Sequence, residues 1–430
     1  MLAGRQGRGT ALLLMLFALI TKRSAAVSAA AALTPRSVAA RRGPPPRAAL
    51  RMKVRVAVVG LPNVGKSSLF NALAQKALAQ ASNFPFCTIE PNVAPVAVPD
   101  KLLAPLGALA RSTRTVSATV DWVDVAGLAK GASRGEGLGN RFLAAVRECD
   151  AICHVVRTFE DVGTIHVDGK VDPVADAEVV NLELLLADLS HVERRLDKTT
   201  CVGEERSALE TVAQGLQQGI PARALNLSDT SAFAIKSMGL LTLKPMLYAF
   251  NVDEVDFSLG RQGAEAHAES ILESIQFCSP STATYTLVSA KAQAELSLRS
   301  TAAQYEYLES LGLELSAGQQ LDDFLCYNVL PAMVQRLLRL SLAYTGPGVP
   351  TERSRTTRAH LFTEDTLSAV QLAGRIHGEI QRGFVCAEVV SAATLLQHDS
   401  YCASKDAGCI RTEGKEYMLQ PEDVIMIKWK

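Results

Sequence analysis

Short apolar runs rich in β-branched residues recur along the chain, and they alternate with segments whose apolar positions have helical spacing. A strand that is buried on both faces is apolar at successive positions, so each run predicts a strand inside a sheet. Strands that alternate with helices predict an α/β fold with a parallel-rich sheet covered on both faces. The expected strands are residues 54–60, 117–127, 151–157, 245–252 and 284–290.

The pattern changes twice further along the chain. Residues 172–196 have apolar positions at helical spacing among many charges, which predicts a helical insert rather than more sheet. After a linker rich in Gly, Pro, Ser and Thr at 344–357, the remaining residues show a small α+β pattern with one helix over 367–384. The expected organisation is a leader at 1–51, a first domain at 52–290 with the helical insert at about 172–240, a helical segment and linker at 291–354, and a C-terminal domain at 355–430.

The leader has the composition of a targeting segment. Its apolar run at 11–20 follows two arginines and is too short to span a bilayer easily, so it fits the core of a signal peptide. The residues after it are rich in Ala, Ser and Arg and contain no acid, which is typical of a transit peptide. The two in series predict a plastid protein without stable membrane insertion. A mitochondrial presequence, or a cytoplasmic protein that starts at Met52, are the alternatives.

Formal charge is divided unevenly between the leader and the rest of the chain. Nine of the 44 Lys and Arg residues lie in 1–51, and the first acidic residue is Glu90. Residues 52–430 therefore hold 35 basic against 44 acidic residues, a net charge of −9. An acidic body argues against general adhesion to nucleic acid, so an RNA contact would need a local basic patch.

Residues 60–68 read GLPNVGKSS, the P-loop pattern G-x4-G-K-S, between an expected strand and an expected helix. Glycines allow such a loop to curl so that its N–H groups face the β- and γ-phosphates of a nucleotide, and the helix directs its positive end at them. Lys66 would neutralise phosphate charge during catalysis, and the Ser67 hydroxyl would bind Mg²⁺. The nucleotide-binding residues expected in this segment are Asn63, Val64, Gly65, Lys66, Ser67 and Ser68.

Two further pieces of a GTPase-type site follow in order. Asp124 ends an expected strand in the sequence DVAG, so it would hold Mg²⁺ through a water, and the Gly127 N–H would meet the γ-phosphate. Thr88 lies in a loop, where its hydroxyl would complete the Mg²⁺ shell when the γ-phosphate is present. Leu128 departs from the common design, since small GTPases have there the glutamine that orients the attacking water. Either hydrolysis is slow or another group positions the water.

The strand expected at 245–252 ends in the frame of the guanine-reading motif NKxD, but its letters are NVDE. Val252 lacks the ammonium of the usual lysine, and Glu254 carries its carboxylate one methylene further out than the usual aspartate. A site that loses a paired polar contact to its ligand loses the discrimination that the pair gave. The motif therefore predicts that adenine is admitted, with Asn251, Val252 and Glu254 at the base.

Several longer segments, between about residue 54 and the C-terminus, together resemble the YchF family, the Obg-like ATPases. They are GLPNVGKSSLFNAL, NFPFCTIEPN, DVAGLAKGASRGEGLGNRFL, HVVRTFED, IHVDGKVDP and NVDE. The resemblance implies an OBG-type G domain with a coiled-coil insert and a C-terminal TGS domain of the β-grasp fold. It also implies an Mg²⁺-dependent hydrolase that prefers ATP to GTP and acts as a ribosome-associated switch in translation or stress response. The large ribosomal subunit would be its partner, with RNA contacts through the insert and the TGS domain.

The resemblance also assigns individual residues. In the family, the backbone at the position of Val252 contacts adenine, and the loop that matches Ser289 and Ala290 closes over the base. The family has a hydrophobic residue at the position of Leu128 and is thought to use a histidine from a flexible loop instead, which matches His166. From the residues alone, His166 lies in a loop flanked by Gly and Asp. A neutral imidazole there could accept a hydrogen bond from water, or it could be an ordinary loop histidine with structural partners.

The sequence departs from the family pattern in two places, which affect the expected length of the insert and the expected contact with RNA or the ribosome. The insert is short around residues 196–210, so its arm is expected to be truncated. Residues 358–367 read RAHLFTEDTL, where the family has a Trp-Thr-Ile run followed by Arg-Lys-Gly, and this change weakens the expected RNA or ribosome contact. An Obg-type GTPase and a nucleotide-binding scaffold without turnover are the alternatives. Val252 and Glu254 count against the first, and Leu128 permits the second.

Overall fold

The computed structural model describes most of the chain beyond the leader. The chain forms two units, Met1–Arg51 and Met52–Lys430, and the first lies outside the described residues. The described residues are 53–81, 92–125, 137–161, 170–254, 256, 261–275, 283–311, 321, 324–346, 356–364, 366–398 and 400–430.

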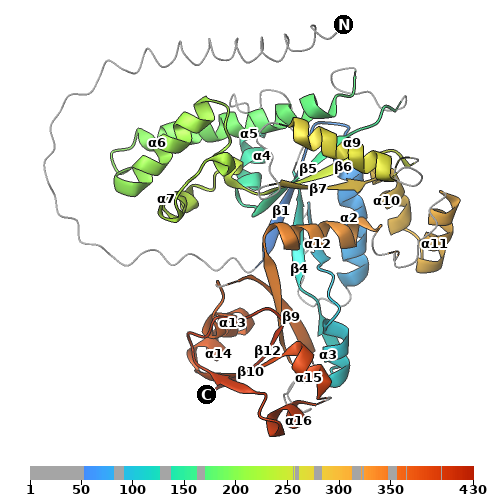
Figure 1. Cartoon of the computed structure of the whole chain (residues 1–430), viewed down its shortest axis with the longest axis vertical. Helices are drawn as coiled ribbons and strands as arrows, with labels where there is room; N and C mark the ends of the chain where they lie inside the picture. The colour runs from blue at the N-terminus through green and yellow to red at the C-terminus, as the bar shows by residue number, and fades with distance from the viewer. Residues whose placement is uncertain are drawn as a thin grey trace, which may run out of the picture. The chain divides into compact units, whose positions relative to one another are not determined.

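A six-stranded sheet in the order β2-β4-β1-β5-β6-β7 forms the centre of the first domain. Its neighbouring strands pair in parallel except β2 and β4, which pair antiparallel. This confirms the predicted α/β fold with a parallel-rich sheet (Figure 1). The strands are β1 (Val54–Val59), β2 (Val93–Ala97), β4 (Thr119–Asp124), β5 (Ala151–Arg157), β6 (Met246–Asn251) and β7 (Ala283–Val288).

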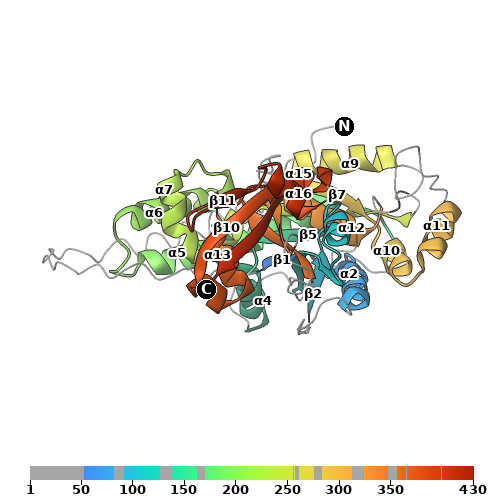
Figure 2. The same ribbon diagram turned by 90° about the horizontal axis from the view of Figure 1, so that it is seen from below.

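Helices cover both faces of this sheet. On one face α2 packs against α10 and α12, and on the other α5 packs against α9; Figure 2 shows α2 and α9 on opposite sides. β5 and β6 are therefore buried at every position, which explains why their sequences are mainly apolar, with His154, Arg157 and Asn251 as buried polar exceptions. Within the described ranges no helix is long and apolar enough to cross a membrane. The helices are α2 (Lys66–Ala81), α4 (Gly137–Arg147), α9 (Arg261–Ser274), α10 (Ala290–Ser297), α11 (Thr301–Ser310) and α12 (Cys326–Leu337).

The carboxyl ends of the parallel strands bring the motifs of the sequence to one edge of the sheet. Gly60 follows β1, Asp124 closes β4, Asn251 closes β6, and Ser289 follows β7. Ligands of open α/β sheets bind outside this edge, so the fold alone places the phosphate-binding and base-reading segments on the same side.

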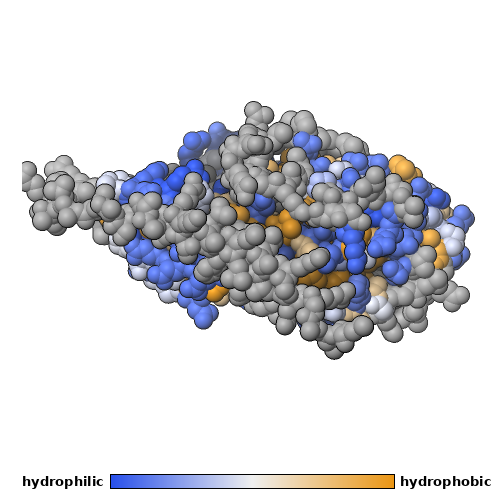
Figure 3. Space-filling view, turned by 90° about the horizontal axis from the view of Figure 1, so that it is seen from above, coloured by the Kyte–Doolittle hydropathy of each residue, from blue (hydrophilic) through white to orange (hydrophobic). Residues whose placement is uncertain are grey.

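A helical insert separates β5 from β6, as the sequence pattern predicted (Figure 1). Its first helix begins sharply because the Asp172 side chain accepts a hydrogen bond from the Ala175 N–H and proline occupies the first turn. Arg195 donates two hydrogen bonds to Glu205, of 2.8 and 2.7 Å, which join the two long helices. The insert has an apolar core of its own, and its side of the molecule is mainly hydrophilic in the view from above (Figure 3). Its elements are α5 (Pro173–Leu196), α6 (Gly203–Gln217), η2 (Ala222–Ala224), α7 (Asp229–Ile235), η3 (Lys236–Met238) and η4 (Leu241–Leu243).

A second six-stranded sheet, in the order β11-β10-β12-β8-β9-β3, forms the C-terminal domain. Short helices pack beside it and complete two apolar clusters. The strands are β3 (Arg114–Val116), β8 (Leu340–Thr345), β9 (Thr356–Thr363), β10 (Phe384–Ser391), β11 (Arg411–Glu413) and β12 (Asp423–Trp429). The helices are α3 (Leu103–Leu109), α13 (Ala369–Ile376), α14 (Gly378–Arg382), α15 (Ala392–Gln397) and α16 (Tyr401–Asp406).

Two strands of this second sheet come from outside the segment 355–430 that the sequence assigned to the C-terminal domain. β8 precedes it, and β3 lies between β2 and β4 in the chain, where it pairs in parallel with β9. The Tyr344 hydroxyl donates a 2.9 Å hydrogen bond to Asp100, which ties β8 to the same segment. The segment between β2 and β4 therefore joins the two sheets. The domain boundary at residue 355 stays a prediction. The sheet itself also includes β3 and β8, which lie before that boundary in the chain.

The helix predicted over residues 367–384 is wrong as a single helix. The structure has α13 and α14 instead, separated at His377, which is fully extended with φ −162° and ψ 142°. The His377 side chain accepts a 3.2 Å hydrogen bond from the Glu379 N–H and so caps α14, while Gly378 adds little helix propensity. Local capping therefore outweighs the helical spacing of the apolar residues.

Candidate nucleotide-binding site

The P-loop has a backbone that only glycine can adopt at two of its positions. Gly60 has φ +151° and Gly65 has φ +98°. A Cβ at Gly60 would lie 2.4 Å from the Val155 carbonyl oxygen, and one at Gly65 would lie 2.5 Å from Nδ2 of Asn251. Both distances are far below van der Waals contact, so the loop requires glycine for its backbone angles and for its close neighbours. The structure thus brings the predicted loop between β1 and α2 into the curled form that such a site needs.

Lys66 is the cation of the loop, and its ammonium is buried. Its side chain is only 7% exposed, and its Nζ donates a hydrogen bond of 2.5 Å to the Leu61 carbonyl oxygen. Burial lowers the pKa of Lys66 to about 8, and the Asp124 carboxylate opposes that shift. An ammonium taken out of water in this way gains more from a nearby phosphate than an exposed one would.

Asp124 and Ser67 are the described oxygen donors that fit a Mg²⁺ ion. Asp124 ends β4, and burial raises the pKa of its carboxyl against the opposing charge of Lys66. Ser67 is exposed in the first turn of α2. Mg²⁺ prefers oxygen ligands and is usually held by one or two carboxylates together with substrate phosphates. Among the residues that the structure describes there is no cluster of three or more His, Cys, Asp or Glu at metal-binding distance. The donors present therefore fit a Mg²⁺ bound jointly by protein and nucleotide.

Asn251 connects three parts of the site. Its Nδ2 donates a 2.9 Å hydrogen bond to the Val64 carbonyl oxygen in the P-loop, and its Oδ1 accepts a 2.8 Å bond from the Ala290 N–H. The residue is 4% exposed, and its own carbonyl oxygen accepts a bond from the Thr158 N–H. The sequence assigned Asn251 to nucleotide binding. In the structure both polar atoms of its side chain bond protein, so it positions the loops on either side.

Val252 and Glu254, which the sequence predicts to lie at the base, present no unpaired charge there. Val252 is 4% exposed, and its N–H donates a 2.9 Å hydrogen bond to the Val288 carbonyl oxygen. The Glu254 carboxylate forms an ion pair with Lys291 through Oε2 and accepts a 2.9 Å hydrogen bond from the Tyr307 hydroxyl through Oε1. Sequence reasoning missed both partners. Lys291 had a signal, because it directly follows the loop residues Ser289 and Ala290, but Tyr307 lies 53 residues away and had none.

Ser289 and Ala290 lie where the strand β7 passes into α10. The Ser289 hydroxyl caps the helix by accepting a 3.4 Å hydrogen bond from the Ala292 N–H, and both residues are buried. The Ala290 N–H is the group already bonded to Asn251. This loop lies against the P-loop, since a Cβ at Gly65 would be 3.1 Å from the Cβ of Ala290. Its closure over a base, which the resemblance implies, stays a prediction.

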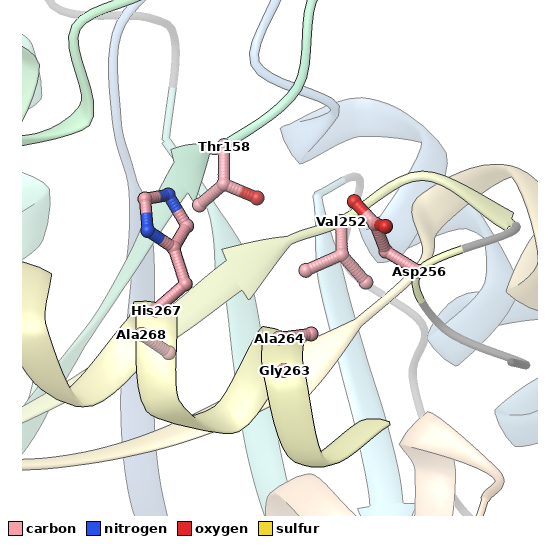
Figure 4. A pocket seen from close by; sticks show the side chains of 7 residues that line it. All are labelled: Thr158, Val252, Asp256, Gly263, Ala264, His267 and Ala268. Atoms are coloured by element: carbon pink, nitrogen blue, oxygen red, sulfur yellow. The ribbon is translucent and has the colours of Figure 1, made fainter. Parts of the chain in front are cut away.

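A cavity of about 230 Å³ opens beside the end of β6. Figure 4 shows Thr158 and His267 on one side of it, and Val252 and Asp256 on the other. This cavity could not be predicted from the sequence, because its lining comes from the residues that follow β5 and β6 and from α9, which are far apart in the chain. Its lining residues are Thr158, Val252, Asp256, Gly263, Ala264, His267 and Ala268.

Four residues that the sequence singled out lie outside the described residues. They are Thr88, Gly127, Leu128 and His166. Their roles as Mg²⁺ ligand, γ-phosphate contact, replaced glutamine and water-positioning group stay predictions. Asn63 and Ser68 are described and exposed at the P-loop and the start of α2, and Asn63 has a left-handed backbone with φ 62°.

The fold and the site define a P-loop nucleotide hydrolase with a GTPase-type sheet. A loop that requires two glycines precedes the helix that begins with Lys66, and Asp124 ends the neighbouring strand. Asn251, at the end of β6, is hydrogen-bonded to the P-loop and to the loop after β7. The chain belongs to the YchF family, as its sequence similarity to members of that family shows.

The comparisons with known proteins agree on this family. A family described as 50S ribosome-binding GTPase matches residues 55–187, and one described as a protein of unknown function, the YchF C-terminal domain, matches 351–430. The chain is 37% identical to the ribosome-binding ATPase YchF of Bacillus subtilis, over 88% of this chain and 100% of that protein. It is 38% identical to the protein of the same name from Escherichia coli O157:H7, over 87% of this chain and 98% of the relative. A solved structure of the Schizosaccharomyces pombe YchF GTPase matches with a TM-score of 0.73 and 31% identity, over 87% of this chain and 98% of that one.

Proposed function

We propose that this chain is a Mg²⁺-dependent ATPase that hydrolyses ATP in preference to GTP and acts as a ribosome-associated regulatory switch in translation or stress response. The names of the Bacillus and Escherichia relatives, ribosome-binding ATPases, support the nucleotide and the ribosome. The observation that supports a preference for adenine is the bonding of the Glu254 carboxylate within the protein. Its carboxylate is already paired with Lys291 and bonded to Tyr307, and its side chain is 18% exposed.

Guanine and adenine differ at the edge that an NKxD motif reads. Guanine offers the carboxylate a pair of N–H donors, whereas adenine offers no such pair. A carboxylate that already accepts from a lysine and a tyrosine has less capacity for the donors of guanine. Val252 adds no ammonium that could hold the base, so the discrimination in favour of guanine is lost.

Base preference can be measured directly by titration calorimetry with ATP and GTP. We expect ATP to bind at least about ten-fold more tightly, since the two N–H donors of guanine would lose water beside a carboxylate that is already bonded to Lys291 and Tyr307. Turnover of both nucleotides is measured beside a Lys66→Ala control. A tighter complex with GTP would overturn the proposal in favour of an Obg-type GTPase, which the description of the Schizosaccharomyces relative as a GTPase supports.

The second rival is a scaffold that binds nucleotide without significant turnover. Leu128 cannot orient water, so hydrolysis needs a polar group from elsewhere, and we assign that role to His166. Single-turnover kinetics separate binding from chemistry and would reveal a scaffold as binding without product.

Mg²⁺ is the cofactor that this site is proposed to use. When bound, it would neutralise charge on the β- and γ-phosphates. Ser67, Thr88 and Asp124 would hold it, the last through a water. The Thr88→Ala substitution should weaken Mg²⁺-dependent binding of the triphosphate more than that of the diphosphate, because the Thr88 hydroxyl is proposed to bind Mg²⁺ only when the γ-phosphate is present. Equal losses for both nucleotides would contradict that role.

The proposed partner is the large ribosomal subunit, and the helical insert and the C-terminal domain are proposed to contact its RNA. Co-sedimentation of the purified chain with ribosomes, with ATP, with GTP and without nucleotide, tests this directly. We expect a nucleotide-dependent fraction in the pellet. No difference between the three conditions would remove the switch from the proposal and leave the nucleotide chemistry untouched.

The plastid is the proposed location, on the composition of residues 1–51 alone. A fusion of these residues to a fluorescent protein in an algal host should be imported and cleaved near Arg51 and Met52. Mitochondrial fluorescence would identify the alternative presequence, and cytoplasmic fluorescence would remove the targeting proposal.

A further inference from the structure

Tyr307 is the distant residue that reaches the base-reading position. It lies on α11, beyond α10, and its hydroxyl donates a 2.9 Å hydrogen bond to Oε1 of Glu254. Lys291 pairs with the other carboxylate oxygen. Both oxygens of the acid that replaces the guanine-reading aspartate therefore have a protein donor.

The position of Tyr307 is itself fixed by its surroundings. The guanidinium of Arg299 lies 4.6 Å from the centre of the Tyr307 ring, and Arg299 pairs with Glu295 at 3.2 Å. The next residue, Leu308, is 1% exposed, and the Gln304 side chain donates a 2.8 Å hydrogen bond to the Leu296 carbonyl oxygen at the end of α10. Packing and hydrogen bonding thus set the register of α11 against α10.

Tyr307 also remains a donor at any physiological pH. Burial, and then its hydrogen bond to the Glu254 carboxylate, raise the pKa of Tyr307 to about 12. The hydroxyl therefore keeps its proton and can bond the carboxylate throughout the working range.

We propose that Tyr307 is a positioning residue for base specificity, which holds the Glu254 carboxylate in its ion pair with Lys291 and so keeps it from accepting the two donors of guanine. The inference rests on the proposed preference for ATP and names the residue that maintains it. Tyr307 acts through Glu254, and no contact between Tyr307 and the nucleotide is required.

The substitution Tyr307→Phe isolates this role because it removes only the hydroxyl. The ring stays under Arg299, and one carboxylate oxygen loses its donor. A part-buried carboxylate without its full set of donors gains more from the N–H groups of guanine. The affinity for GTP should then rise about ten-fold relative to that for ATP, as expected for one regained hydrogen bond to a charged group.

The experiment is titration calorimetry of ATP and GTP with five proteins: the original chain, Tyr307→Phe, Tyr305→Phe, Glu254→Gln, and Glu254→Gln combined with Tyr307→Phe. Tyr305 is the matched control, since it lies 42% exposed on the same helix. We expect the ratio of the two affinities to move toward GTP in Tyr307→Phe alone. In the Glu254→Gln background the second substitution should have no effect, because the charge through which it acts is gone.

The outcomes distinguish this inference from the function on which it rests. If the original chain binds GTP more tightly, the proposed ATP preference fails. If it prefers ATP but Tyr307→Phe leaves the ratio as in Tyr305→Phe, the positioning role fails alone. Equal losses of affinity for both nucleotides in Tyr307→Phe, or the same shift with and without the Glu254 charge, would make Tyr307 a structural residue and also overturn the inference.

Discussion

The two ends of the nucleotide site are built in different ways. The phosphate end, residues 60–68 together with Asp124, takes its shape from a short continuous loop with two obligatory glycines. The base end, made by Asn251, Val252, Glu254 and the loop 289–290, is held by contacts between distant parts of the chain. The bond from Asn251 to Val64 alone spans 187 residues.

The difference shows which features can change independently. Backbone N–H groups and a lysine bind the phosphates of any nucleotide, so the phosphate end is indifferent to the base. In the proposed function side chains decide the base, and the two proposed for this role, Val252 and Glu254, can change without altering the loop. Asn251 is the exception, since it belongs to the base end but bonds the P-loop. Substitutions at the phosphate end should therefore affect ATP and GTP alike, and those at the base end should change their ratio.

The largest effect is expected for Gly65→Ala at the phosphate end. Alanine would be strained at φ +98°, and its Cβ would lie 2.5 Å from Nδ2 of Asn251. We expect the affinities for ATP and GTP to fall together by about 100-fold or more, because strain and overlap each cost a sizeable fraction of the binding energy. Calorimetry measures both.

The matched control for this substitution is Gly219→Ala in the helical insert. Gly219 also has a positive φ, of +82°, but a Cβ there would meet no atom within 4 Å. It therefore reproduces the backbone strain without the overlap in the site, and nucleotide affinity should be unchanged. A Gly65→Ala protein that folds and binds as Gly219→Ala does would contradict the assignment of the loop.

The next effect in size is expected for His166→Ala, which tests the chemistry at the phosphate end. If His166 orients the attacking water, turnover should fall by roughly 10²-fold, the usual scale for a positioned acid–base group. The affinity for ATP should change little, since the histidine would act in the transition state. Turnover of the original chain should fall as pH drops through the imidazole pKa, because only the neutral ring can accept a proton. His377→Ala, at an exposed position in the C-terminal domain, is the control, and equal turnover in both variants would transfer the role to a partner.

A smaller effect is expected when the base end is returned to the guanine-reading pattern. Val252→Lys with Glu254→Asp restores the ammonium and the shorter carboxylate, which no longer reaches Lys291 and Tyr307 in the same way. We expect the ratio of affinities to move toward GTP by about ten-fold, with turnover per bound nucleotide unchanged. A double variant that loses both nucleotides equally would show that the base end is not separable from the loop.

The position and curled shape of the P-loop could be predicted from the sequence because they have local causes. A glycine pattern between a strand and a helix fixes the loop within a few residues, and the structure places Lys66 and Asp124 at the same edge of the sheet. The strand and helix periodicities likewise predicted the parallel-rich sheet and the helical insert. In each case the physical cause lies within a short window of sequence.

What the sequence could not predict depends on long-range contacts. Tyr307 has no motif, and its role arises only when α11 packs beside α10. β3 is three residues long and becomes a strand because β9 offers it a partner edge. The break at His377 follows from a cap that competes with the helical spacing around it. The contacts of Tyr307 with Glu254 and of β3 with β9 each join residues far apart in the chain, so a short window of sequence contains only one of the two partners. At His377 the periodicity of apolar residues does not show whether capping or helix continuation is more stable.

The smallest expected effect concerns the proton on Lys66. It distinguishes the phosphate end from the base end through the pH dependence of nucleotide affinity, without a substitution. Burial lowers the pKa of Lys66 to about 8 in the free protein, and a bound phosphate would favour the charged form and raise it. Linkage then requires that nucleotide affinity is highest below pH 8 and falls as pH rises through this pKa, by about three-fold between pH 7.5 and pH 8.5. The terminal phosphate of the nucleotide is already ionised in this range, since its last pKa lies near 6 in comparable phosphates. ATP and GTP should weaken in parallel between pH 7.5 and about pH 8.5, with their ratio constant, because the base end contributes nothing to this proton. Calorimetry in buffers of different ionisation enthalpy would measure the proton taken up on binding. An affinity that does not change with pH, or a ratio that does, would place the proton elsewhere than Lys66.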